Sequence, residues 1–100
     1  MKGRYILTKD AGKKTTTDTG DVEIGDIPTK NRNGVSAEVE MQVGFARGYG
    51  EIKVTAQVRL TCAQTSEAIE QAGKAAHLAA CGLAFDGFND VCDAMGVSKS

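Results

Sequence analysis

The sequence is poor in the residues that build large cores and rigid turns. Its 100 residues include no tryptophan, five aromatic residues and a single proline. No hydrophobic run approaches the roughly 20 apolar residues that span a bilayer, and nothing near the amino end resembles a signal peptide. These features predict one domain over residues 1–100 with a modest core and no membrane contact.

Cysteine and histidine are also scarce. The three cysteines, Cys62, Cys81 and Cys92, are odd in number and lack paired spacing, so they do not form a disulfide framework. We expect reduced thiols and a cytoplasmic location. His77 lies one helical turn before Cys81, but zinc needs about four converging ligands. The sequence therefore predicts neither a metal nor a cofactor.

The formal net charge of −1 differs from that of a generic, strongly basic nucleic-acid binder. The charge is unevenly spread, because residues 1–34 are net positive and residues 63–100 are net negative. Such a difference is typical of a solvated surface and less often steers a charged partner.

Apolar residues alternate with polar ones over Val35–Phe45 and again over Ile52–Cys62. This period of two predicts two long strands joined as an antiparallel hairpin, each with one dry face. Both dry faces must lie on the same side of the sheet. Two registers satisfy this condition: one places Glu38 opposite Arg59, and the other closes a tight turn at Arg47-Gly48. The sequence leaves both open.

A helix is expected directly after the hairpin, with Thr65 or Ser66 as its N-cap. One apolar stripe consists of Ile69, Ala72, Ala76, Ala79, Ala80 and Leu83, and a second of Leu78, Cys81, Phe85, Phe88 and Cys92. A helix that is apolar on two sides is usually sandwiched. The alanines at four-residue spacing, Ala72 to Ala84, allow a second backbone to approach closely, so we expect a homodimer or higher oligomer. A kink or break is expected near Gly87.

The first third of the chain has weaker patterns. Arg4–Thr8 is consistent with a strand, and Val22 and Ile24 with a short second one. Residues 9–20 have no apolar pattern and predict a mobile loop. The expected fold class is α+β: an antiparallel sheet with a long central hairpin, packed by one C-terminal helix in the order β-β-β-β-α. Small dimeric single-strand nucleic-acid binders of the coactivator type share this order, but their signature residues are not found here, so the order implies no family.

Catalytic motifs are not supported by the residue spacing. Gly12-Lys13-Lys14-Thr15 resembles part of a phosphate-binding loop, but Leu7 stands where the loop needs glycine and Lys14 where it needs serine or threonine. Phosphate binding by the two lysines without that fold stays open. The acids Asp86, Asp90 and Asp93 follow one helical face, which is typical of a solvated stripe. We therefore expect a protein that is not an enzyme.

The tip of the hairpin, Gly44–Gly50, combines Arg47 and Tyr49 with three glycines. Arginine and aromatic rings can stack on bases, although the glycines can equally serve the turn while Tyr49 covers a core edge. The expected binding residues are Arg47, Tyr49, Lys13, Lys14, Lys30, Arg32, Lys53 and Arg59.

Two functions are consistent with these observations. The first is a small non-enzymatic binding protein that acts as a homo-oligomer and contacts single-stranded nucleic acid. The alternative is a phage-type accessory or inhibitor protein that binds another protein or a small anionic ligand. The predicted wet face of the sheet carries no aromatic residue, which weakens the first hypothesis without excluding it.

Overall fold

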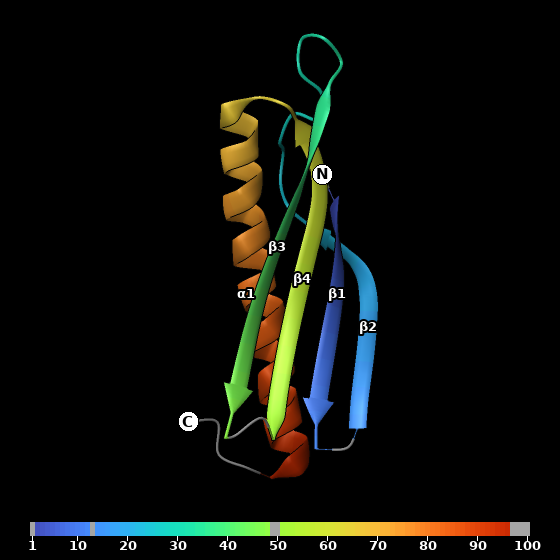
Figure 1. Ribbon diagram of the computed structural model, residues 1–100, viewed down its shortest axis with the longest axis vertical. Helices are drawn as coiled ribbons and strands as arrows, with labels where there is room; N and C mark the ends of the chain where they lie inside the picture. Colours follow the sequence, from blue (N-terminus) through green and yellow to red (C-terminus); the bar gives the residue numbers. More distant parts are fainter. Residues whose placement is uncertain (1, 13, 49–50, 97–100) are drawn as a thin grey trace.

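A computed structural model describes residues 2–12, 14–48 and 51–96. Its elements are β1 (Lys2–Ala11), β2 (Lys14–Glu23), β3 (Ser36–Arg47), β4 (Ile52–Ala63) and α1 (Ser66–Met95). The strands form one antiparallel sheet in the order β2-β1-β4-β3, and α1 lies along one face of it (Figure 1). The α+β class and the order of elements are confirmed. The hairpin is not central as a whole, because β4 is an inner strand and β3 is an edge strand.

The alternating pattern places the predicted apolar face of the hairpin under α1. Every second residue of β4, from Ile52 to Cys62, is buried. Both registers considered from the sequence are wrong, because Arg47 pairs with Ile52, and Arg59 lies opposite Glu40. The connection therefore spans residues 48–51, longer than a tight turn, and begins at Gly48 with a φ of 67°. Alternation specifies which face a residue takes, whereas the connection length sets which residue it faces.

The expected loop over residues 9–20 is wrong for its described residues. Residues 9–11 belong to β1, and residues 14–20 belong to β2, which ends at Glu23 before Ile24. α1 packs mainly on β4 and β3 and little on β1, so both faces of β2 are largely exposed. A strand without a covered face needs no apolar alternation, which is why threonines and charges conceal it in the sequence.

The helix begins and ends at well-defined caps. The Thr65 side chain accepts a hydrogen bond from the Ala68 backbone N–H at 3.1 Å, and Gly96 ends the helix in the left-handed conformation. The expected break near Gly87 is not present, because α1 is continuous to Met95. A Cβ at Gly87 would lie 3.1 Å from the Val54 side chain, so this glycine allows the helix to approach the sheet. Within the described residues, no helix combines the length and the apolarity needed to cross a membrane.

The alanine ladder packs inside the chain. Ala72, Ala76, Ala80 and Ala84 are all buried within the core that α1 forms with the sheet. The expectation that this ladder joins two copies is therefore wrong, because its close approach is already used within one chain. The second stripe divides, since Phe88 is buried whereas Leu78 and Phe85 are 75% and 54% exposed.

Candidate functional site

The sheet face opposite α1, called the open face here, brings two arginines together. Arg4 of β1 pairs with Arg59 of β4, so the two side chains lie next to each other on the two inner strands. Lys2 and Lys53 occupy the same face by strand alternation. We call these four residues, Lys2, Arg4, Lys53 and Arg59, the central track.

Carboxylates border the central track on both sides. Asp21 of β2 lies opposite Arg4, and Glu40 of β3 lies opposite Arg59. Within β1 and β4 themselves, Asp10 is the single carboxylate, and it accepts a hydrogen bond from the Thr15 hydroxyl at 2.6 Å. At the end of the sheet where β1 begins, the open face therefore has two adjacent arginines with carboxylates on both sides.

Arg59 is held by two carboxylates of β3. Its Nε lies 3.0 Å from Glu38 Oε1, and its terminal nitrogen Nη2 lies 2.7 Å from Glu40 Oε2. The hydrogen bond from Arg59, supported by one from Gln57, lowers the pKa of Glu40 below its ordinary value. Glu40 and Glu38 in turn raise the pKa of Arg59. All three side chains are exposed, so water competes for these contacts and a phosphate can replace a carboxylate.

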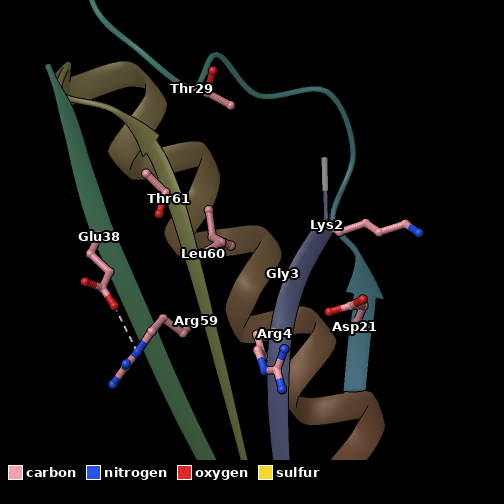
Figure 2. Close-up of a pocket in the computed structure, with 9 residues that line it drawn as sticks. All are labelled: Lys2, Gly3, Arg4, Asp21, Thr29, Glu38, Arg59, Leu60 and Thr61. Carbon is pink, nitrogen blue, oxygen red and sulfur yellow. Dashed lines mark ion pairs between the residues drawn. The ribbon is translucent and has the colours of Figure 1, made fainter. Parts of the chain in front are cut away.

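Arg4 makes no ion pair within the described part of the chain. Figure 2 shows it between Asp21 and Arg59, beside an open hollow of about 500 Å³. A neighbouring hollow of about 160 Å³ is lined by Arg4, Ile6, Gln57 and Arg59. Guanidinium and amide groups of this kind donate hydrogen bonds to phosphate oxygens, and the exposed Ile6 offers an apolar surface to a sugar or a base.

The expected binding residues are divided among three places. Lys53 and Arg59 lie on the central track. Lys30 and Arg32 lie on the connection between β2 and β3, at the end of the molecule away from both hairpin tips (Figure 1). Thr29, just before Lys30, lines the larger hollow.

Lys14 and Arg47 lie at the hairpin tips. The Gly12 backbone N–H donates a hydrogen bond to the Glu51 carbonyl oxygen at 2.9 Å, which joins the two tips. Both side chains take the helix side of the sheet: Lys14 lines a hollow with Met95 of α1, and Arg47 follows the helix-facing Phe45 by two positions. Lys13 and Tyr49 are outside the described residues.

Lys2 and Arg4 are functional candidates that the sequence reasoning missed. Their alternate spacing places both on one face of β1. Their importance arises from the pairing of β1 with β4, which brings Arg4 beside Arg59. That pairing joins segments about half the chain apart, and no local pattern in the sequence indicates it.

The described residues contain no group of three or more His, Cys, Asp and Glu residues suited to holding a metal. His77 Nε2 lies 3.6 Å from Cys81 Sγ on the exposed part of α1. No family model matches the chain, and comparisons with curated proteins and with solved structures return no match.

Proposed function

We propose that this chain is a small non-enzymatic binding protein that acts as a homo-oligomer and contacts single-stranded nucleic acid along the central track. The observation that carries the proposal is the Arg4–Arg59 neighbour pair on the open face, in which Arg4 has no ion pair among the described residues. A cation without a partner on an accessible face is available to a phosphate.

The length of the central track suits an extended single strand of nucleic acid. β1 and β4 pair over Arg4–Ala11 and Ile52–Arg59, and these paired positions run for about 27 Å at roughly 3.4 Å per residue. Between the cations lie neutral hydrogen-bonding side chains, Thr8, Thr55 and Gln57. A backbone that follows the track meets charged groups near its ends and neutral groups between them.

The width of the central track favours single-stranded over double-stranded nucleic acid. The inner strands are about 4.8 Å apart, and carboxylates lie immediately outside them on β2 and β3. A second phosphate backbone would meet these carboxylates. Because the four strands place no aromatic side chain on the open face, affinity would come mainly from phosphate contacts, with strong salt dependence and little sequence preference.

The test is a titration of labelled single-stranded DNA and RNA, followed by fluorescence anisotropy at about 50 and 200 mM salt. We expect Arg4→Gln to weaken binding about fivefold or more and to reduce the salt slope by about 0.7 for one lost phosphate contact. The matched control is Lys74→Gln, which removes the same charge from α1, where Lys74 pairs with Glu70. The control should bind as the wild type does.

A second variant tests the same site in the opposite direction. Glu38→Gln combined with Glu40→Gln releases Arg59 and removes two bordering charges, so binding should become severalfold tighter. Wild-type protein that does not bind either nucleic acid at low salt would show the proposal to be wrong. Equal weakening by Arg4→Gln and Lys74→Gln would show only a general charge effect and would also contradict it.

A small anionic ligand is the second candidate, and a different observation favours it. A hollow of about 420 Å³ lies between the β1–β2 tip and the end of α1, lined by Lys9, Lys14, Val91 and Met95 among others. Asp90 also lines this hollow, and Lys9 pairs with Asp18 at 3.8 Å. Lys14, beside the apolar wall, is therefore the cation that would hold an amphipathic carboxylate or phosphate. In this case Lys14→Gln, and not Arg4→Gln, would abolish binding of a fatty-acid probe measured by calorimetry.

A further inference from the structure

The outer edge of β3 is unusually suited to pairing with another strand. β3 is 12 residues long, lies at the edge of the sheet and contains no proline. Its helix-side residues are only partly buried: Ala37, Val39, Met41, Val43 and Phe45. A long edge with an apolar face is a template for strand addition, and native edges are normally blunted by short length, charges, prolines, bulges or a covering element. The other edge, β2, is protected in that way by threonines and charges.

The flank of α1 beside β3 continues this apolar surface. Phe45 contacts Phe85 edge-on and also contacts Phe88, both with ring centroids 6.1 Å apart. Leu78 lies two helical turns before Phe85 and therefore on the same side of α1. Because Leu78 and Phe85 are largely exposed, the apolar surface extends from the β3 edge onto the helix.

We infer that β3 pairs antiparallel with β3 of a second copy of this chain, so that the two sheets join across a two-fold axis. This inference rests on the proposed homo-oligomer and names its interface. Charge limits the register: a pair centred on Glu40 sets two Glu40 side chains against each other, which is unfavourable. A pair centred on Met41 or Gln42 places Glu38 and Glu40 opposite uncharged residues of the other copy. The strand is therefore compatible with itself in these two registers.

The spacing of the helices agrees with the same pairing. α1 packs to a similar extent on β3 and β4, so its axis lies near the boundary between them. Joining two copies at β3 separates these boundaries by two strand spacings, about 10 Å. Packed helices lie about 8–10 Å apart. One contact thus pairs the free edge, brings the two helices together and covers Leu78 and Phe85.

The first test is the oligomeric state by sedimentation equilibrium at micromolar concentration. We expect a dimer for the wild type. Gln42→Glu adds an acid near the axis on an exposed side chain and should raise the dissociation constant about threefold or more. Thr17→Glu is the matched control, because it adds the same charge to the same face of the other edge strand. The melting temperatures of the two variants report whether either substitution disturbs the fold.

The second test is cross-linking in a Cys81→Ser background. Directly opposed residues of an antiparallel pair have Cα atoms about 4.5–5.5 Å apart, within the range that a disulfide bridges. Met41→Cys and Gln42→Cys report the two registers, and one of them should form an intermolecular disulfide under mild oxidation. Gln57→Cys is the control: Gln57 pairs with Gln42 on the same face but lies one strand further inside, so it should not cross-link.

The outcomes separate the inference from the proposal beneath it. A monomeric wild type would overturn both the homo-oligomer and its interface, whatever the nucleic-acid titration shows. A dimer that resists Gln42→Glu and forms neither disulfide would overturn the β3 interface alone. A dimer broken by Thr17→Glu instead would assign the contact to β2 and would equally overturn the inference.

Discussion

The two hairpins of this sheet have similar lengths but very different surroundings. In the β3–β4 hairpin, α1 covers one face, and one full side of β4 is buried. In the β1–β2 hairpin, α1 reaches little of β1, and β2 is exposed along nearly all of its length. β2 is held by its backbone pairing with β1 and by the packing of Tyr5 over Gly20. Stability should therefore be concentrated in the covered hairpin, leaving the other free to vary its surface.

The largest expected difference in stability is between two isoleucines, one in each hairpin. Ile52 of β4 is 1% exposed, whereas Ile6 of β1 lies on the open face and is 41% exposed. Ile52→Ala should lower the free energy of unfolding by about 2–5 kcal/mol, through lost burial and a cavity. Ile6→Ala should change it by less than about 1 kcal/mol. Urea denaturation measures both, and equal losses would contradict the contrast between the hairpins.

The alanine ladder gives the next largest effect. Ala80 is fully buried against the sheet, so Ala80→Leu should lower the free energy of unfolding by about 1–3 kcal/mol through overpacking. Ala75→Leu, on a more exposed side of α1, is the control and should have little effect. Thermal denaturation and sedimentation are measured together. An Ala80→Leu protein that melts at the wild-type temperature but dissociates would instead place the alanine ladder in an interface between two copies.

Hydrogen exchange sharpens the comparison without a mutation. Amides of β4 should exchange only through global unfolding, because this strand is paired on both sides and covered on one face. Amides of β2 that bond to β1 should exchange through a smaller, local opening. Exchange measured by NMR in the native state gives both opening free energies. Matching values for the two strands would mean that the sheet opens as a single unit.

The smallest expected effect comes from the polar face of the covered hairpin. The pKa of Glu40 is lowered in the folded protein by Arg59, so the protonated carboxyl is disfavoured there relative to the unfolded chain. The resulting stability is present above the unfolded pKa of Glu40 and is lost as pH falls through its lowered folded pKa. Wild type should be slightly more stable than Glu40→Gln at neutral pH, and this difference should disappear in acid. Denaturant midpoints across that range measure it, and a constant difference would contradict the linkage.

The sequence predicts the covered parts of this fold better than the exposed ones. Alternation over β3 and β4 and the capping residue Thr65 are local signals, and the structure confirms them. Only the end of β2, at Val22, was recognised in this way, because the rest of the strand is exposed on both faces and requires no apolar residues. The alanine ladder was visible, but small residues show only that something packs closely, and not whether the neighbour is a sheet or a second chain.

The candidate site shows the same division. Lys53 and Arg59 were identified on the wet face of a strand that alternation revealed. Arg4 was missed because its position beside Arg59 depends on a long-range pairing between β1 and β4. The expected grouping of Lys30 with Arg47 was not found. Lys30 precedes Asn31, which donates a hydrogen bond to the Gln64 carbonyl beyond the end of β4, whereas Arg47 pairs with Ile52 at the start of β4. Residue type and spacing identified candidate groups, whereas topology decided which of them are neighbours.

The unequal charge of the sheet and the helix gives the molecule an electric dipole across its thickness. The four strands together carry seven cations and six carboxylates, whereas α1 carries five acids and one lysine. The field of a polyanion exerts a torque on this dipole, which turns the sheet toward the polyanion and the helix away from it. The torque acts before any contact, over distances up to a Debye length of about 10 Å at 0.1 M salt. Orientation during encounter is thus a property of the charge distribution as a whole, separate from the affinity of any single arginine.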